Sequence, residues 1–195
     1  MNNKTTNTAF TDLPLSSDIL QAISDTGYTK PTPIQAEVIP AVLSGKDVMA
    51  ASQTGSGKTA GFVLPILEKL YQQQRENRRE NQHRGAPSQD IRVLILTPTR
   101  ELAAQVNESI HIYSKHLRLR HGVVFGGVNI NPQIRMLQRG LDILVATPGR
   151  LLDLYNQKKV RFSQVNTLIL DEADRMLDMG FIPDIMKINK LLPKI

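Results

Sequence analysis

A glycine-rich segment at residues 52–59, Ser-Gln-Thr-Gly-Ser-Gly-Lys-Thr, has the residue types that bind a triphosphate. It follows a short apolar run and precedes an amphipathic segment, which predicts a strand, a loop and a helix. Glycines let backbone N–H groups turn toward phosphate oxygens, and the new helix presents its positive end to them. Lys58 would reach the terminal phosphates, and the Thr59 hydroxyl would ligate Mg²⁺. The general pattern has glycine where Ser52 stands, and the alternative is an ordinary Gly/Ser-rich turn.

An acidic pair, Asp171 and Glu172, follows the apolar run 165–170 far downstream. A phosphate-binding loop needs carboxylates opposite it, the first to hold the metal ion and the second to polarise the attacking water. The alternative is a polar strand end or a helix N-cap, because Asp and Glu favour the first turns of helices. Together with the lysine and threonine of the loop, the pair indicates nucleotide chemistry.

The composition of the 195 residues is that of an ordinary globular protein, with 41% hydrophobic and 22% charged residues. Cysteine is absent, so neither disulfides nor thiolate metal sites are possible. The polar N-terminus and the lack of a membrane-length apolar run lead us to expect a cytoplasmic protein. A net charge of +6 favours a polyanionic partner or serves solubility alone. Because aromatic residues are few, we expect phosphate-backbone contacts rather than base stacking.

Strand-like apolar runs alternate with helical patterns along the chain. The runs 47–51, 92–96, 121–125, 142–145 and 167–170 are the candidate strands. The candidate helices are 59–73, 100–116, 132–139, 150–156 and 183–192. Continuous Val/Ile/Leu runs are typical of strands buried on both faces, and the alternation predicts an open parallel α/β sheet with helices on both faces. Ligands of such sheets lie at the carboxyl ends of the strands, where both phosphate-handling motifs fall.

A polar segment at 72–90 interrupts this pattern, and we interpret it as a helix that frays into a flexible, mildly basic insert. Its arginines would either touch nucleic acid or face water. After the final helical pattern the sequence stops at Pro193-Lys194-Ile195 without a closing element, which we interpret as a truncation, with a natural terminus as the alternative.

Taken together, the motifs resemble the N-terminal RecA-like domain of DEAD-box RNA helicases, a family of P-loop NTPases. Residues 171–174 spell Asp-Glu-Ala-Asp, and 27–35 resemble the Q motif of the family. Pro98-Thr99-Arg100-Glu101-Leu102, Gly126-Gly127 and Thr147-Pro148-Gly149-Arg150 resemble its RNA-strand motifs, in the expected order. The resemblance covers essentially the whole chain and comes nearest to the bacterial RhlE-like subgroup. It implies an N-terminal extension with the Q motif at 1–36 and a RecA-like ATP-binding domain at 37–195.

The resemblance also implies a role for each nucleotide-site residue. Gln35 would read the adenine edge, and Phe10 would stack on the adenine ring. From the pattern alone, Gln35 is an exposed polar residue at a helix start and Phe10 anchors the N-terminus. Lys58, Asp171 and Glu172 would be catalytic, with Glu172 as general base or water-positioning group and with Thr59 and Asp171 on Mg²⁺. Residues that bind ATP would be Phe10, Lys30, Gln35, Thr54, Gly55, Ser56, Gly57, Lys58 and Thr59.

One RNA strand would be held through its sugar-phosphate backbone, without sequence readout. The contacts implied are Pro98, Thr99, Arg100, Gly126, Gly127, Thr147, Pro148, Gly149 and Arg150. Asp174 would link the nucleotide site to neighbouring motifs. Thr99 and Thr147 also fit ordinary helix starts, and the two interpretations are compatible because a helix N-terminus binds anions.

The second RecA-like domain of the family, with its arginine finger, has no counterpart in these residues. Such a finger accelerates phosphoryl transfer by several orders of magnitude. We therefore expect a monomeric fragment that binds adenine nucleotide, hydrolyses ATP poorly and unwinds nothing by itself. The alternatives are a stand-alone nucleotide-dependent binding module and a DNA translocase on the same fold.

Overall fold

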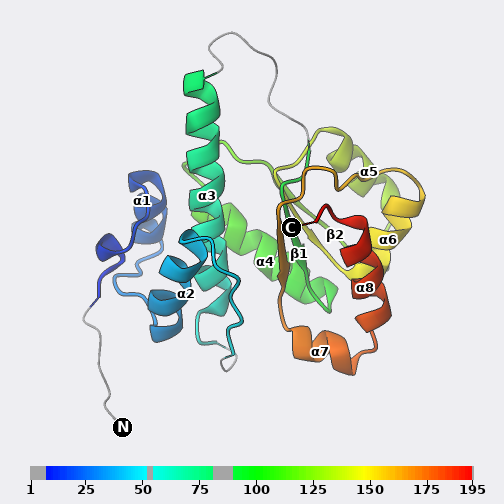
Figure 1. Cartoon of the computed structure of the whole chain (residues 1–195), viewed down its shortest axis with the longest axis horizontal. Coiled ribbons are helices and arrows are strands. Elements are labelled where there is room, and N and C mark those ends of the chain that lie inside the picture. The colour runs from blue at the N-terminus through cyan, green and yellow to red at the C-terminus, as the bar shows by residue number, and fades with distance from the viewer. Residues whose placement is uncertain (1–7, 52–54, 81–89, 195) are drawn as a thin grey trace. The chain divides into compact units, whose positions relative to one another are not determined.

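The computed structural model describes residues 8–51, 55–80 and 90–194 (Figure 1). These residues form two compact units. The first holds residues 8–80 and 109–118, and the second holds residues 90–108 and 119–194, within the described ranges. The division into 1–36 and 37–195 stays a prediction.

The first unit is helical. A 3₁₀ turn, η1 (Phe10–Asp12), precedes α1 (Ser17–Asp25), α2 (Pro33–Leu43) and the long α3 (Lys58–Glu80), and the end of α4 (Arg100–Tyr113) adds a further segment. Pro33 occupies the first position of α2, where its missing N–H is not needed. Ile19 of α1 and Leu64 and Leu67 of α3 are fully buried.

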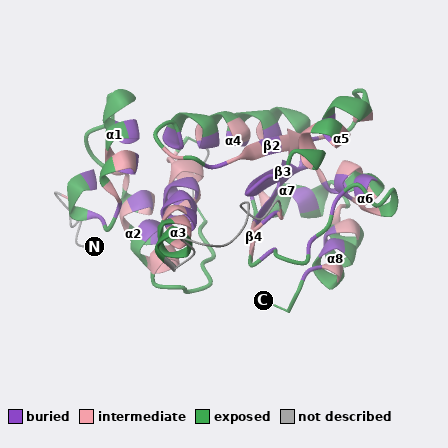
Figure 2. Ribbon diagram, turned by 90° about the horizontal axis from the view of Figure 1, so that it is seen from above, coloured by how far each residue is buried: buried purple, intermediate pink, exposed green. Residues whose placement is uncertain are grey.

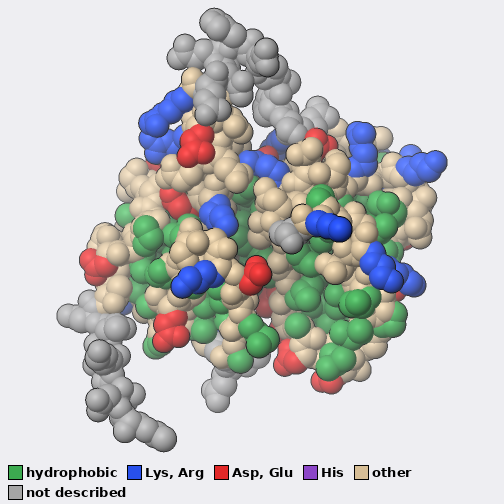
Figure 3. All heavy atoms as spheres, viewed as in Figure 1, with side chains coloured by type: hydrophobic (Ala, Val, Ile, Leu, Met, Phe, Trp, Pro, Cys, Tyr) green, Lys and Arg blue, Asp and Glu red, His purple; other side chains and the backbone are tan. Residues whose placement is uncertain are grey.

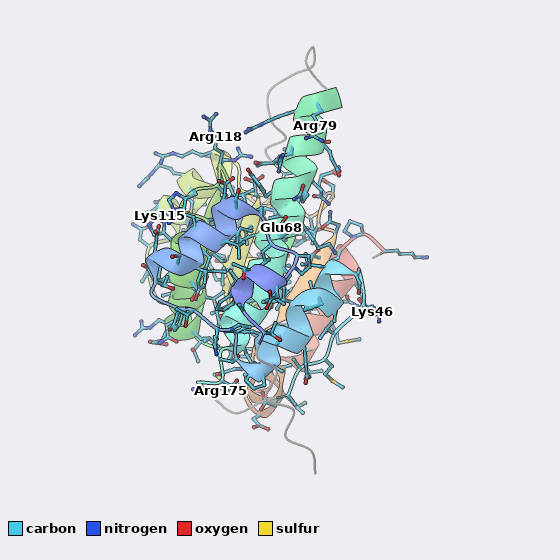
Figure 4. The ribbon with its side chains drawn as sticks, turned by 90° about the vertical axis from the view of Figure 1, so that its left-hand side faces the viewer. Lys46, Glu68, Arg79, Lys115, Arg118 and Arg175 are labelled. Carbon is cyan, nitrogen blue, oxygen red and sulfur yellow. The ribbon has the colours of Figure 1, made fainter. Side chains whose placement is uncertain are left out.

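Polar contacts also hold the first unit together. Glu68 of α3, labelled in Figure 4, is only 5% exposed and accepts a hydrogen bond from the Ser16 backbone N–H at 2.7 Å. The Tyr71 hydroxyl donates to the Asp18 carboxylate. Both contacts join the beginning of α1 to α3, so they fix α1 against the helix that begins at the phosphate-loop lysine.

The second unit is built on a four-stranded, fully parallel sheet of order β2-β3-β1-β4. Its strands are β1 (Val93–Leu96), β2 (His121–Val124), β3 (Ile143–Ala146) and β4 (Thr167–Leu170). Every residue of β1 and β3 is buried, as expected of central strands covered on both faces. Among the described residues β4 pairs only with β1, and its residues are half-buried or exposed.

Helices α5 (Ile130–Gln138), α6 (Pro148–Asn156), α7 (Ala173–Asp178) and α8 (Ile182–Leu191) complete this unit. Leu94, Leu96, Leu144 and Ala146 point to one face of the sheet and share a core with side chains of α6, α7 and α8. Figure 2 shows α6 and α8 beside one another, with the part of α4 that belongs to this unit, residues 100–108, along the other side of the sheet. The α/β fold with a parallel sheet and flanking helices is therefore confirmed.

The predicted strand at 47–51 is wrong. These residues form no regular element, and Met49 is 98% exposed. The run contains only two large apolar residues, Val48 and Met49, both exposed, so burial does not hold it in a sheet. Among the described residues of 72–90, those up to Glu80 extend α3, and 81–89 lie outside the described residues. Helices α1 and α7 were not predicted.

Candidate nucleotide and nucleic-acid sites

The phosphate-loop residues that the structure describes lead directly into α3. Gly55 and Gly57 have φ values of +80° and +87°, a conformation that L side chains rarely adopt. Lys58 is the first residue of α3 and, like Thr59, is half-buried. The first N–H groups of any α-helix lack intrahelical acceptors, which is why helix starts such as this one bind phosphate. Thr54 lies outside the described residues.

Gln35 connects this loop to α2. Its Oε1 accepts a hydrogen bond from the Thr32 N–H at 3.0 Å and completes a capping box, while its Nε2 donates to the Gly57 carbonyl at 3.1 Å. A Cβ at Gly57 would collide with Gln35 Nε2. Gln35 is 7% exposed, so the pattern-based expectation of an exposed residue is wrong. Capping and contact with the loop bury its amide, and these two bonds use one of its two N–H groups and one of its two lone pairs.

Two further predicted nucleotide-site residues lie in the first unit with different exposure. Phe10 is 6% exposed within η1, as an anchor of the N-terminal segment would be. Lys30 is exposed and precedes the capping box of α2. Neither position tests their predicted roles at the adenine and phosphates.

The acidic motif lies where β4 ends. Asp171 is 9% exposed, and its N–H donates to the Leu96 carbonyl of β1 at 3.0 Å. Glu172 has φ +54° and ψ +51°, a left-handed conformation that is costly for a residue with a Cβ. Its carboxylate accepts a hydrogen bond from Arg175 Nη1 at 3.2 Å. Asp174 is exposed in the first turn of α7. The structure therefore holds a buried carboxylate and a strained one side by side in the chain.

The predicted RNA-binding residues converge on one groove of the second unit, with a volume of about 580 Å³. They follow β1, β2 and β3 in turn, so the carboxyl ends of three adjacent strands bring them together. The groove is lined by Pro98, Thr99, Arg100, Glu101, Gly126, Thr147, Gly149, Arg150, Asp153, Met179 and Phe181. Gly127 lies beside it, since a Cβ there would stand 3.7 Å from Arg100 Nη1. Pro148 is buried at the first position of α6.

Two arginines give the groove its positive charge. Arg100 Nε donates to Glu101 Oε1 at 2.7 Å, and this contact holds the pKa of the Glu101 carboxyl below its usual range. Arg150 Nη2 donates to the Val128 carbonyl at 2.9 Å. Arg150 Nη1 is buried and has no hydrogen-bond partner among the described residues. A buried guanidinium N–H without an acceptor is costly, and the same guanidinium is balanced in part by Asp153, whose Oδ2 lies 3.9 Å from Arg150 Nε.

The two threonines of the groove differ in their local role. Thr99 Oγ1 accepts a hydrogen bond from the Leu102 N–H at 3.2 Å, so it caps α4 as an ordinary helix start would. Thr147 is the N-cap residue of α6 but makes no side-chain capping bond. The helix-start interpretation therefore holds for the Thr99 side chain and not for that of Thr147.

Sequence reasoning missed four residues that line the groove. Met179 and Phe181 give it an apolar wall, and Glu101 and Asp153 place two carboxylates in it. Exposed apolar side chains continue along α7 and α8, where Figure 3 shows hydrophobic side chains gathered at the lower right. For the two apolar residues a signal was available in the short sequence separation between Asp171 and Phe181. So few residues cannot carry the chain far from the end of β4.

The DEAD/DEAH box helicase family profile matches residues 32–195, which is most of the chain. The chain belongs to the DEAD/DEAH box helicase family. Its α/β sheet is accordingly that of a RecA-like domain, and the family prediction from the motifs is confirmed.

Individual relatives from three bacteria agree with this assignment. The chain is 45% identical over 193 residues to the RNA helicase CrhR of Synechocystis sp. (strain ATCC 27184 / PCC 6803 / Kazusa), covering 99% of the chain and 36% of that protein. It is 43% identical over 184 residues to the DEAD-box ATP-dependent RNA helicase CshA of Bacillus subtilis (strain 168), covering 94% and 34%. It is 46% identical over 188 residues to the ATP-dependent RNA helicase DeaD of Escherichia coli (strain K12), covering 96% and 28%.

The chain thus spans about a third of the length of these relatives. The RhlE-like subgroup stays a prediction. No helix in the described part of this DEAD-box domain combines the length and apolar character needed to cross a membrane.

Proposed function

We propose that this chain is the ATP-binding domain of an ATP-dependent RNA helicase, and that it holds one RNA strand by its sugar-phosphate backbone. The observation that carries the proposal is the groove at the carboxyl ends of β1, β2 and β3. Its hydroxyls, glycine backbone and arginines are groups that bind phosphate without reading bases. Family membership and the names of the three helicase relatives support the same activity.

The nucleotide is proposed to lie on the phosphate loop, with Lys58 at its terminal phosphates. Gln35, Phe10 and Lys30 are proposed to bind the adenine side. Thr59 and Asp171 offer the hydroxyl and carboxylate oxygens that Mg²⁺ prefers, and the bound ion would neutralise charge on the phosphates. Glu172 would orient the attacking water and accept its proton, and Asp174 would couple this site to neighbouring motifs.

The domain alone is proposed to hydrolyse ATP poorly, because the second RecA-like domain and its arginine finger are needed for phosphoryl transfer at speed. We further propose that it is monomeric and cytoplasmic.

Calorimetric titration of the 195-residue chain with ADP and with GDP, in the presence of Mg²⁺, tests the nucleotide site. We expect ADP to bind in preference to GDP, and Gln35→Ala to weaken ADP binding. Equal binding of both nucleotides would contradict adenine recognition by Gln35. Fluorescence anisotropy with RNA and with DNA of the same sequence separates RNA-directed activity from a DNA translocase.

A further inference from the structure

The second unit contains another hollow, of about 880 Å³, that the proposed function does not use. Ten described residues line it: Asp90, Ile91, Leu137, Gln138, Tyr155, Asn156, Lys158, Lys159, Val160 and Arg161. They come from the approach to β1 and from the carboxyl-terminal ends of α5 and α6. Helices that connect parallel strands run against the strand direction, so these ends lie at the amino ends of the strands. The hollow is therefore at the end of the sheet opposite the groove.

The hollow is basic. Lys158, Lys159 and Arg161 are exposed and follow α6 within a single turn, while Asp90 is the one carboxylate among the lining residues. In the described part of the chain, no carboxylate lies within 4.0 Å of any of these three cations. Three cations that are not neutralised by partners, around a hollow of ligand size, favour an anion.

The backbone at Lys158 supports a binding role. Lys158 and Glu172 are the only non-glycine residues with positive φ among those that the structure describes. The Lys158 N–H donates to the Tyr155 carbonyl at 2.8 Å, and the Lys159 N–H donates to the Leu154 carbonyl at 2.9 Å, which ends α6 in a left-handed turn. Glycine is the usual residue at such a position. Here a lysine with φ +58° occupies the position although that conformation is strained for it. The turn itself does not require a lysine, so we attribute its presence to its side chain.

The remaining lining groups fit a nucleotide chain. Tyr155 is stacked on Phe162 with a centroid separation of 5.4 Å and an interplanar angle of 4°, so its ring is held rigidly beside the cations. The amides of Gln138 and Asn156 are exposed at the same hollow and offer both donors and acceptors. Cations, amides and a fixed aromatic ring together are the groups that bind single-stranded nucleic acid without sequence preference.

We propose that this basic hollow is a second RNA-binding site, which holds the phosphate backbone of a single-stranded segment away from the groove. RNA is favoured over an acidic protein because the same unit is already proposed to hold RNA, and two linked contacts on one strand raise its apparent affinity. The inference therefore rests on the proposed function. A purely structural role for the cations, at the negative end of the α6 dipole, predicts a change in stability and none in RNA affinity.

The test is anisotropy titration of the 195-residue chain with a labelled single-stranded oligouridylate at low salt. We expect the triple variant Lys158→Gly, Lys159→Gln, Arg161→Gln to bind about fivefold or more weakly, with a shallower dependence on salt. The variant Lys187→Gln, Lys190→Gln, Lys194→Gln removes the same charge from elsewhere in this unit and is expected to retain most of the affinity. Lys158→Gly alone is expected to weaken binding while its thermal midpoint stays the same or rises.

Each other outcome overturns the inference in a recognisable way. Suppose that the native chain binds RNA, that Arg100→Gln weakens this binding and that the triple variant leaves it unchanged. The second site is then wrong, and the proposed function stands. If the native chain binds no RNA, the proposed function fails with it. If the triple variant keeps its RNA affinity but loses binding of a polyglutamate peptide, the hollow takes an acidic protein segment.

Cross-linking with 4-thiouridine is expected to label the peptide around 155–161, and labelling confined to the groove would contradict the proposal.

Discussion

Glu172 shows how function and local conformation compete at a single residue. It holds the catalytic position that the motif predicts, and it does so in a left-handed conformation that glycine would adopt without cost. Its carboxylate lies at hydrogen-bond distance from Arg175, a contact that is largely exposed and contributes little to stability. Retaining a strained glutamate beside the buried Asp171 is consistent with a carboxylate that is needed for chemistry.

Glu172→Gly is therefore expected to leave stability unchanged or to raise it by up to about 1 kcal/mol. Under the proposed function, the same change would abolish ATP hydrolysis in a longer protein that joins this domain to a second RecA-like domain. Glu172→Gln is the matched control, because it removes the charge but keeps the strained backbone. Thermal unfolding of the 195-residue chain and ATPase assays of the longer protein measure the two effects. A marked loss of stability in the glycine variant would contradict the strain argument.

At Arg100, the neighbouring Glu101 competes with any anionic ligand, because its carboxylate accepts a hydrogen bond from the guanidinium Nε. The hydrogen bond from Arg100 lowers the pKa of the Glu101 carboxyl, so under the proposed function this carboxylate would compete with an RNA phosphate for Arg100. The stability from this exposed pair is present above the unfolded pKa of Glu101 and is lost as the pH falls through the folded value.

Glu101→Gln is expected to strengthen RNA binding about two- to fivefold, since it removes a negative charge from the groove and releases Arg100. Arg100→Gln is expected to weaken it. Anisotropy titrations at fixed salt provide the comparison, and the thermal midpoint should fall only slightly in both variants, because the lost pair is exposed. Weaker binding by Glu101→Gln would show that this carboxylate orients Arg100 for RNA.

At the scale of elements, a buried carboxylate fixes the start of the sheet. Asp142 precedes β3 and is 4% exposed. It accepts from Arg92 Nη2 at 2.8 Å and from the Arg120 backbone N–H at 2.8 Å, so it connects the approaches to β1, β2 and β3. These same strands carry the groove at their other ends.

Asp142→Ala is expected to destabilise the fold by about 3 kcal/mol, because it removes the buried carboxylate that accepts from Arg92 Nη2 and from the Arg120 backbone N–H. For a chain of this size that lowers the thermal midpoint by roughly 6–12 °C. Asp184→Ala removes a carboxylate 3.7 Å from the exposed Lys187 and serves as the control, with a cost of about 0.5 kcal/mol or less. Equal shifts in the two variants would contradict the role assigned to Asp142.

The elements also show where sequence reasoning succeeds and where it does not. The four observed strands were predicted to within one residue at either end, because continuous apolar runs such as 167–170 identify buried parallel strands. The run 47–51 has the same pattern but lacks the burial, which only tertiary structure decides. The hydrogen bond from Gln35 to Gly57 and the apolar wall of Met179 and Phe181 depend on contacts between distant segments, so local patterns do not reveal them.

At the scale of the whole molecule, the net charge of +6 and backbone-directed contacts predict binding that depends on salt more than on sequence. If about four phosphates are neutralised, the affinity for single-stranded RNA should fall roughly 50-fold between 50 and 200 mM salt. Oligonucleotides of different sequence should give the same slope within error, measured by anisotropy. A weak salt dependence with a strong preference for one sequence would instead require base readout, which the small aromatic content and the glycine, hydroxyl and arginine groups of the groove do not favour.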